Sequence, residues 1–390
     1  MKRIYLDYAA LTPISFGVLF RSFITTLTVY GNPGSIHKEG VVAKKMIESA
    51  KKDIANILHT QMEHIIFTSG GTEGCNLVIF GVLHKAIANG IEKPNIIISA
   101  IEHPAVYDTC ISLERENKIT LTILPVDEKG VVKEKDLRES INENTVLVCV
   151  HYINNEVGTI EPIKDLARVV KKYRKEKESL YPLFFTDSAQ APNLFPIHID
   201  SLGVDFVTLN GSKIYGPRSS GILFVKDREM IDGIILGGSQ EYGLRAGTED
   251  VGKIVGFTQA LINADKNRIS EYTKIENIQK VARKLLEEKV PEARTTIDSE
   301  FCSPHILHIT IPNFDSETVI LYLDQKGFAV SSKSACKTDD EEVSHVLKAL
   351  NLEENKLLSS IRISFGRKTK IRDIENFVNT LRQTLDILKK

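Results

Sequence analysis

Two kinds of segment alternate through the first two thirds of the chain. Short runs rich in Ile, Val and Phe, apolar on both faces, occupy residues 64–68, 95–99, 145–150, 183–186, 204–209 and 221–225. Their length and composition predict strands of a buried, largely parallel sheet. Between them, stretches such as residues 41–58 and 163–175 carry apolar side chains at helical spacing. This alternation is typical of an α/β fold with helices on both faces of the sheet.

The pattern changes near residue 251, where a long, charged segment with helical spacing begins and continues to residue 288. We interpret it as a connector that leads out of the sheet domain. Beyond it, residues 306–311 and 328–331 are typical of strands, and residues 318–323 and 374–388 are typical of helices. The last third of the chain is therefore predicted to form a smaller α+β domain.

Composition and charge exclude several classes of partner. Hydrophobic residues make up 42% of the 390 residues, and the 50 Lys and Arg nearly balance the 51 Asp and Glu. This balance gives no general attraction to nucleic acid or to an anionic membrane. Residues 14–30 are fairly apolar, but Arg21 interrupts them, and they fall short of the roughly 20 apolar residues of a membrane span. We expect them to form a helix packed on the body of a soluble protein that has no membrane or direct nucleic-acid partner.

The five cysteines indicate a reducing compartment, and we expect a cytoplasmic protein. They are widely spaced and form no C-x-x-C pair, so neither a disulfide framework nor a zinc site is predicted. Cys110 and Cys149 lie in apolar surroundings and are expected to be buried. Cys336 follows a predicted strand and lies among small, polar and charged residues, which predicts an exposed loop where a thiolate could act as a nucleophile. An ordinary, unreactive thiol is the alternative.

A glycine-containing turn, residues 68–73, directly follows one predicted strand and precedes a helical segment. Backbone N–H groups at such a helix start can hold a phosphate; the turn contains Gly71, and Thr72 adds a hydroxyl donor. A plain strand-to-helix turn is the alternative. The chain contains neither G-x-G-x-x-G nor a Walker A motif, which weakens the case for a nucleotide.

Asp187 and Gln190 stand at the end of one predicted strand, and Lys213 follows a later one. Because parallel strands end at the same edge of a sheet, these side chains are expected in one crevice. An amine and a carboxylate placed there suit pyridoxal 5'-phosphate (PLP), in which lysine forms a Schiff base and aspartate pairs with the pyridinium nitrogen. A structural ion pair, or two unrelated surface charges, is the alternative.

Taken together, these segments resemble the cysteine desulfurase family, within the class-V aminotransferase-like PLP enzymes. The resemblance covers nearly the whole chain. It rests on the motifs at residues 31–37, 68–76, 102–106, 154–158, 187–190, 213–217, 243–248, 334–336 and 360–364. It implies a type I PLP-dependent transferase fold, with a mainly parallel seven-stranded sheet in a large domain (residues 15–255). Residues 1–14 and 256–390 would form the small domain that carries the Cys336 loop.

The resemblance also implies a role for each matching residue. Lys213 would bind PLP covalently, and His103 would stack on its ring and help move protons. Asp187 would hold the pyridinium nitrogen and Gln190 the phenolic oxygen. The remaining positions implied in cofactor or substrate binding are Gly71, Thr72, Asn155, Asn210, Ser212 and Thr248 for PLP, and Arg362, Asn155 and Asn32 for the substrate. Thr248 would reach the phosphate of the other subunit, which implies a homodimer.

The implied reaction removes sulfur from L-cysteine and gives L-alanine and a persulfide on Cys336. A sulfur-acceptor protein, either a scaffold for iron–sulfur clusters or a tRNA-thiolation enzyme, would then take the sulfur. Asn210 and Ser212 depart from the family pattern, which has serine and histidine there, but both can still donate hydrogen bonds. Two alternatives remain: selenocysteine lyase or another class-V PLP reaction, and a non-catalytic sulfur-relay or scaffold-binding subunit.

Overall fold

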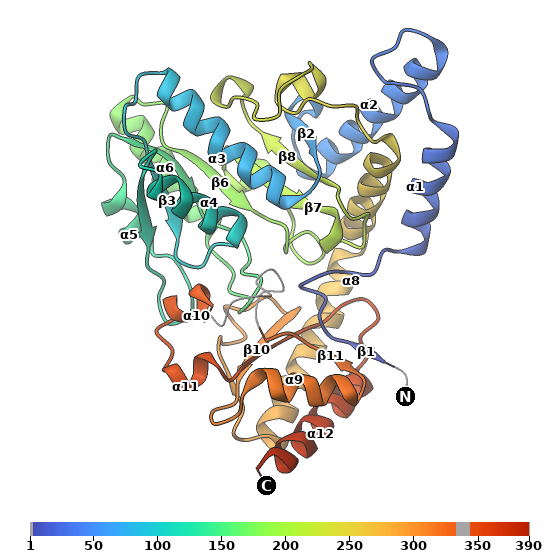
Figure 1. Cartoon of the computed structure of the whole chain (residues 1–390), viewed down its shortest axis with the longest axis vertical. Coiled ribbons are helices and arrows are strands. Elements are labelled where there is room, and N and C mark those ends of the chain that lie inside the picture. The colour runs from blue at the N-terminus through green and yellow to red at the C-terminus, as the bar shows by residue number, and fades with distance from the viewer. Residues whose placement is uncertain (1–2, 333–343, 390) are drawn as a thin grey trace.

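The computed structural model describes residues 3–332 and 344–389, and its upper part is built on a seven-stranded sheet (Figure 1). The strands are β2 (Ile65–Thr68), β3 (Asn95–Ser99), β4 (Thr120–Leu124), β5 (Thr145–Cys149), β6 (Leu183–Asp187), β7 (Phe206–Asn210) and β8 (Gly221–Val225). Their order is β2-β8-β7-β6-β5-β3-β4. All neighbouring pairs are parallel except those of β8 with β2 and β7. The predicted mainly parallel sheet is therefore confirmed.

The strand that the apolar runs did not reveal is β4. It lies at the edge of the sheet, beside β3 alone, and only Leu124 of its five residues is buried. An edge strand exposes part of its surface to solvent, so its sequence need not be continuously apolar. Its exposure accounts for the missing pattern.

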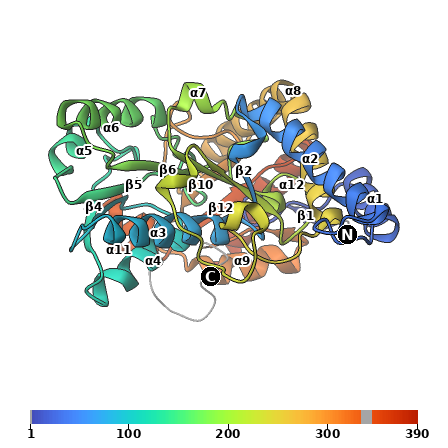
Figure 2. The same cartoon turned by 90° about the horizontal axis from the view of Figure 1, so that it is seen from above.

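Helices cover both faces of this sheet, as the alternation predicts (Figure 2). One face is covered by α2 (Lys38–Leu58), α5 (Glu134–Ser140), α6 (Ile163–Lys177) and α7 (Ile199–Leu202), and the other by α3 (Gly71–Ala88) and α4 (Pro104–Arg115). Successive side chains of a strand point to opposite faces. In β3, Ile97 accordingly joins the first core, whereas Ile96 and Ile98 join the second.

The lower part of the molecule combines the N-terminal strand with the last third of the chain. Its strands are β10 (Ile306–Thr310), which pairs antiparallel with β9 (Arg294–Thr295) and β12 (Ser360–Ser364), and β1 (Ile4–Tyr5), which pairs parallel with β11 (Phe328–Ala329). Its helices are α9 (Ser316–Gln325), α10 (His345–Ala349), α11 (Glu354–Leu357) and α12 (Ile371–Leu388). The buried residues of α12 recur at helical spacing, and the helix thereby covers this small core.

One long helix, α8 (Val251–Lys289), connects the two parts (Figure 1). Near its start Phe257 is buried in the core of the large sheet, and near its end Leu286 is buried in the small core. The connector predicted from the charged helical pattern is confirmed. Four short 3-10 helices complete the described elements: η1 (Met62–His64), η2 (Gly211–Lys213), η3 (Arg228–Met230) and η4 (Gln240–Gly243).

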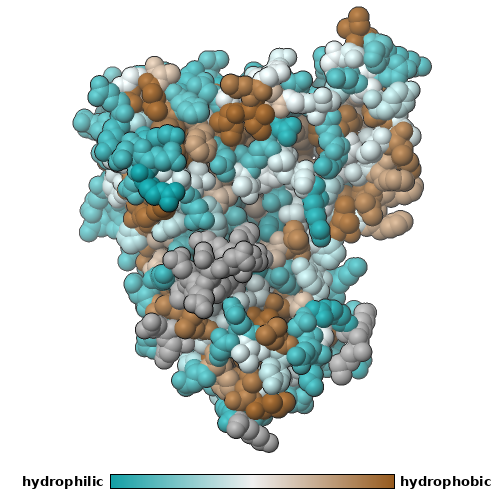
Figure 3. Space-filling view, viewed as in Figure 1, coloured by the Kyte–Doolittle hydropathy of each residue, from teal (hydrophilic) through white to brown (hydrophobic). Residues whose placement is uncertain are grey.

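Helix α1 (Phe16–Thr28) forms within residues 14–30, as expected, and packs against α8. Its outer face is apolar and exposed: Phe16 is 82% exposed, and Phe20, Phe23 and Leu27 are each more than half exposed. Figure 3 shows hydrophobic surface, in brown, at the right of the view, where Figure 1 places α1. Within the described ranges, no helix combines the length and apolarity needed to cross a membrane.

Candidate active site

A cleft forms where β6 and β7 end, between the large sheet and the lower part of the molecule. Parallel strands bring their carboxyl ends to one edge, and the polar residues that follow them therefore converge. The cleft gathers the predicted residues Gly71, Thr72, His103, Asn155, Asp187, Gln190, Asn210, Lys213 and Arg362. Ala9, Ala10 and His151 also line it, although the sequence gave no reason to select them. Segments from both ends of the chain thus build one site.

The glycine-containing turn lies at one end of the cleft, where α3 begins at Gly71. Gly70, which precedes the helix, has φ of 147°, a conformation that glycine adopts readily because it has no Cβ. The free N–H groups of the first turn of α3 can donate to an anion. Glu73 accepts from the backbone N–H of Ser69 (2.9 Å) and from Arg245 Nε (2.9 Å), which closes the turn on its outer side.

Asn210 and Ser212, the two departures from the family pattern, are hydrogen-bonded to each other beside this turn. The Asn210 side-chain oxygen accepts from the backbone N–H of Ser212 at 3.1 Å and from its hydroxyl at 3.0 Å. The Asn210 amide lies within 4 Å of the position that a Cβ at Gly70 or Gly71 would occupy. Because its oxygen is used by Ser212, the nitrogen is the end of the Asn210 amide that remains to donate toward an anion held at the turn.

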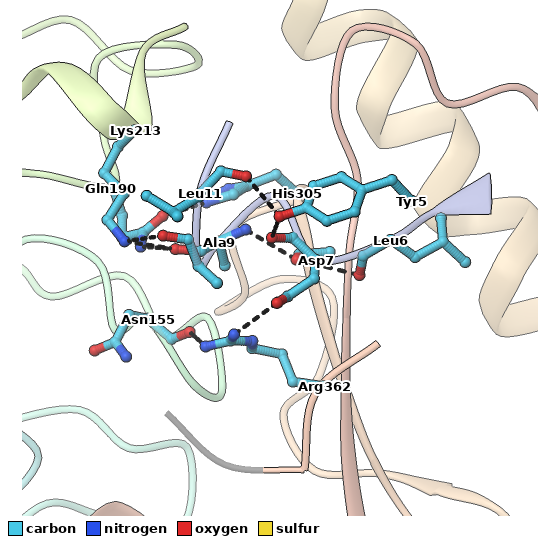
Figure 4. Close-up of polar contacts among 12 residues, drawn as sticks. Tyr5, Leu6, Asp7, Ala9, Leu11, Asn155, Gln190, Lys213, His305 and Arg362 are labelled. Atoms are coloured by element: carbon cyan, nitrogen blue, oxygen red, sulfur yellow. Dashed lines mark hydrogen bonds and ion pairs between the residues drawn. The ribbon is translucent and has the colours of Figure 1, made fainter. Parts of the chain in front are cut away.

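Lys213 and Asp187 lie deeper in the cleft. The Lys213 amine donates to the backbone carbonyls of Ala9 (2.9 Å) and Ala10 (2.6 Å), from the N-terminal segment (Figure 4). Asp187 ends β6, and its Oδ1 accepts from the backbone N–H of Ala189 at 2.9 Å. Its other oxygen lies 3.9 Å from the sulfur of Cys75, and burial, with the nearby Asp187 charge, raises the pKa of that thiol well above its usual value.

His103 is both a helix cap and a cleft residue. Its Nδ1 accepts from the backbone N–H of Ala105 at 3.1 Å and caps α4, which begins at Pro104. The same ring lines the cleft. Capping therefore holds the ring in place and assigns Nδ1 the acceptor role, which leaves Nε2 as the nitrogen able to carry a proton.

Arg362 lies in β12, is only 2% exposed and reaches the cleft from the lower part of the molecule. Its Nη1 donates to the backbone carbonyl of Asn155 (2.9 Å) and its Nη2 to Asp7 Oδ1 (2.8 Å) (Figure 4). Its Nε is buried and has no partner among the described residues. The guanidinium is thus held in a fixed orientation by two segments where it meets the cleft.

A buried cluster of titratable groups lies behind the cleft. Glu102 Oε1 is 3.2 Å from His151 Nδ1 and accepts a hydrogen bond of 2.5 Å from Ser99. Burial alone would lower the pKa of His151, but the charge and hydrogen bond of Glu102, with smaller contributions from Glu161 and Asp187, together outweigh it and raise the pKa of the imidazole. Burial also raises the pKa of Glu161 to about 8. We expect Glu161 to be largely protonated at neutral pH.

The order and spacing of these residues match known proteins along the whole chain. The model of the class-V aminotransferase family matches residues 4–377. Cysteine desulfurase IscS of Dictyoglomus turgidum is 34% identical over 390 residues, which covers 100% of this chain and 96% of that protein. The chain belongs to the cysteine desulfurase family.

Solved structures agree with this membership of the desulfurase family. A NifS-like protein superposes with a TM-score of 0.90 at 30% identity and covers 99% of this chain and 100% of its own. SspA in complex with cysteine superposes with a TM-score of 0.78 at 30% identity, covering 93% of this chain and 98% of its own. The desulfurase fold predicted from the sequence motifs is therefore confirmed.

Among the described residues that the desulfurase resemblance implies, Asn32, Ser212 and Thr248 are not part of the lining of the cleft. Asn32 lies in the loop between α1 and α2, where its Oδ1 accepts from Gly34 N at 2.9 Å. Thr248 lines a neighbouring pocket with Ser219 and Arg245. Cys336 lies outside the described residues. Cys110 and Cys149 are buried, as predicted, and in residues 3–332 and 344–389 no His, Cys, Asp or Glu cluster could hold a metal.

Asp7 and His305 contact predicted site residues but were not themselves predicted. Asp7 comes from the N-terminal segment and pairs with Arg362, and His305 precedes β10 and contacts Gln190. Neither residue stands in a local pattern that indicates chemistry. Only their contacts in three dimensions reveal them.

Proposed function

We propose that the chain is a PLP-dependent cysteine desulfurase that converts L-cysteine to L-alanine and leaves the sulfur as a persulfide on Cys336. The observation that supports this most strongly is the combination of Lys213, Asp187, Gln190 and His103 in one cleft, with the buried Arg362 on its other side. An amine, a carboxylate and an imidazole could also form a structural network, but family membership favours the cofactor site.

The donor set of the cleft fits the chemical groups of PLP. The phosphate would be held by the first turn of α3, with Gly71 and Thr72, and by Asn210 and Ser212 beside it. Asp187 would pair with the pyridinium nitrogen, and Lys213 would hold the cofactor covalently. When bound, PLP supplies an electron sink that weakens the bond from carbon to sulfur in the substrate.

The residues of this chain would perform the remaining work. Arg362 and Asn155 would bind the substrate carboxylate, since both line the cleft and the Arg362 guanidinium is held in a fixed orientation. Lys213 and His103 would move a proton at the substrate carbon. The Cys336 thiolate would then attack the cysteine sulfur: a sulfur–sulfur bond forms, the carbon–sulfur bond breaks, and its electron pair remains with the carbon skeleton that leaves as alanine.

We further propose that the protein acts as a homodimer in the cytoplasm and passes sulfur to an acceptor used in iron–sulfur cluster assembly or tRNA thiolation. Two observations support a dimer: the exposed apolar face of α1, and the position of Thr248 outside the cleft of its own chain. The described cysteines, Cys75, Cys110, Cys149 and Cys302, are unpaired thiols, which fits a reducing compartment.

The test is a visible absorption spectrum of the purified protein with PLP, before and after L-cysteine, together with an assay for alanine. A band that changes with cysteine and yields alanine supports the proposal. A band without alanine would move the proposal to another class-V reaction such as selenocysteine lyase, tested with selenocysteine. Absence of any band would favour a non-catalytic sulfur-relay subunit in which Asn210 and Ser212 no longer support PLP.

The role of Cys336 is tested with the variant Cys336→Ala. It should keep the visible band and lose turnover, because the cofactor site does not include this residue while sulfur transfer requires it. Cys110→Ala is the matched control: Cys110 lies in α4 and is buried in the core, and its variant should retain turnover once it is folded. Sulfide release at the parent rate from Cys336→Ala would refute the assigned nucleophile.

A further inference from the structure

Gln190 is joined to two buried polar side chains from the segment before β10. His305 Nε2 lies 3.2 Å from Gln190 Oε1, and His305 Nδ1 lies 2.7 Å from the Ser303 hydroxyl. On its other side, Gln190 Nε2 donates to the backbone carbonyl of Ala9 at 2.9 Å (Figure 4). Ser303, His305 and Gln190 are all buried. They form one continuous chain of hydrogen bonds that ends at the cleft.

The chemistry of these groups gives the hydrogen bonds one direction. The carbonyl of Ala9 can only accept, so the Gln190 NH₂ group must face it and the Gln190 oxygen must face His305. His305 Nε2 must then be protonated and donate a hydrogen bond to the Gln190 oxygen. This leaves Nδ1 to accept a hydrogen bond from the Ser303 hydroxyl. Burial, with a smaller contribution from the Arg362 charge, lowers the pKa of His305 to about 3. The ring is therefore neutral at physiological pH, as this arrangement requires.

The far end of the chain of hydrogen bonds is itself fixed. The Ser303 backbone N–H donates to the carbonyl of Gly158 at 2.7 Å, and Gln279 of α8 donates to the carbonyls of Ser303 (3.2 Å) and Ile306 (2.8 Å). Gly158 has φ of 85°, and a Cβ there would lie only 2.7 Å from the sulfur of Cys302. The segment that carries Ser303 and His305 is thus held closely against the turn that contains Asn155.

We propose that Ser303 and His305 are positioning residues that fix the Gln190 amide with its NH₂ group, rather than its oxygen, toward the phenolic oxygen of PLP. The inference rests on the proposed function and adds to it two residues that are not part of the lining of the cleft. Of the two amide protons of Gln190, one is used by Ala9, and the other is available to the cofactor. A reversed amide would set the Gln190 oxygen against the Ala9 carbonyl oxygen and the Gln190 NH₂ group against the His305 N–H, so Ala9 and His305 together favour the orientation shown.

This role has a spectroscopic consequence. In the PLP-loaded protein, the Gln190 NH₂ group would donate to the phenolic oxygen and stabilise negative charge on it. This charge is less compensated once the nearby nitrogen on Lys213 has lost its proton, so Gln190 would favour the deprotonated form. Gln190 in the correct orientation therefore lowers the pH at which the visible band titrates. Loss of one hydrogen bond to a charged group corresponds to about one pH unit.

The experiment is a pH titration of the visible band in the PLP-loaded protein and its variants. His305→Phe, which fills the space but cannot donate, should move the midpoint upward by about one unit. His305→Gln, which can donate to Gln190 and accept from Ser303, should return it to near the parent value. Gln190→Leu should give the same upward shift, and the double variant with His305→Phe should add nothing to it, since both act on one interaction.

Each outcome decides the proposal. An unchanged midpoint in His305→Phe, or shifts of His305→Phe and Gln190→Leu that add in the double variant, overturns it, because a merely structural histidine affects only the melting temperature. If His305→Phe fails to fold, Ser303→Ala decides: an upward shift supports the role and an unchanged midpoint overturns it. A parent protein that forms no visible band with PLP refutes the proposed function itself, and this role with it.

Discussion

Replacing Arg362 by lysine keeps the positive charge of the cleft but removes the planar guanidinium. Arg362 uses Nη1 on the carbonyl of Asn155 and Nη2 on Asp7, and its buried Nε has no partner among the described residues. The oriented guanidinium can therefore present two adjacent N–H groups to a carboxylate. A lysine amine has no such fixed pair of donors, and it cannot serve Asn155 and Asp7 at the same time.

The expected effect follows from the loss of about one hydrogen bond between charged groups. Such a bond contributes about 1.5–3 kcal/mol, which corresponds to a factor of roughly 10 to 150 in affinity. We expect the KM for L-cysteine to rise by about this factor, while kcat falls much less, because the carboxylate is held alike in the ground and transition states. The assay is alanine formation over a range of cysteine concentrations with the PLP-loaded protein.

Arg367→Lys is the matched control. Like Arg362, Arg367 is paired with a carboxylate, that of Glu271. Arg367 is partly buried and its guanidinium stacks on Tyr215, but it does not line the cleft. This variant should lose stability without changing KM by more than about twofold. A KM in Arg362→Lys equal to that of the parent, or an equal rise in both variants, would refute the assignment of Arg362 to the substrate carboxylate.

Three further predictions concern the surroundings of the cleft. His103→Asn should melt like the parent because asparagine can cap α4, whereas His103→Ala should lose about 1 kcal/mol; both should alter the spectrum of bound PLP, and unchanged spectra would remove His103 from the cofactor site. Burial raises the pKa of Glu161 to about 8 from an ordinary 4.5, so the folded protein keeps a proton that the unfolded chain releases, and stability falls as pH rises through this window. In urea unfolding, Glu161→Gln should therefore gain at least about 1 kcal/mol on the parent between pH 5 and pH 8, and parallel pH profiles would contradict the raised pKa. Lys51→Met leaves Glu241 buried without its partner at 2.8 Å and should destabilise the protein by about 3 kcal/mol or more in urea unfolding, whereas the exposed Lys52→Met should have little effect; equal effects would contradict the importance of the pair.

The strands of the large sheet could be predicted because the apolar character of each strand's own sequence reflects its burial. Strands covered on both faces need apolar side chains on both faces, and β3 and β8 occupy the very residues that the apolar runs indicated. The edge strand β4 carries no such signal, since only Leu124 is buried. For the same reason the exposed face of α1 could not be foreseen: helical spacing shows that a face is apolar, not what covers it.

The candidate site also combines features that the sequence predicts with features that only the structure shows. The glycine-containing turn, the carboxylate at the end of β6 and the lysine after β7 were predictable, because strand ends place their following residues at one edge. Whether Asn210 and Ser212 could still serve the turn depended on their contact with each other, which the sequence does not contain. His103 could be assigned as a helix start or as a cleft residue from its motif, and the structure shows that it is both.

The sequence by itself determined the fold class, the family and the residue types of the candidate chemistry, since these follow from local periodicity and from motifs that are contiguous in the chain. Only the tertiary structure decided which distant groups orient them. Asp7 holds Arg362 across 355 positions of sequence, and His305 holds Gln190 across 115. A hydrogen bond requires an approach of about 3 Å and a defined direction. Between residues so far apart, that approach is set by the packing of the two parts of the molecule around the cleft, and no local pattern records it.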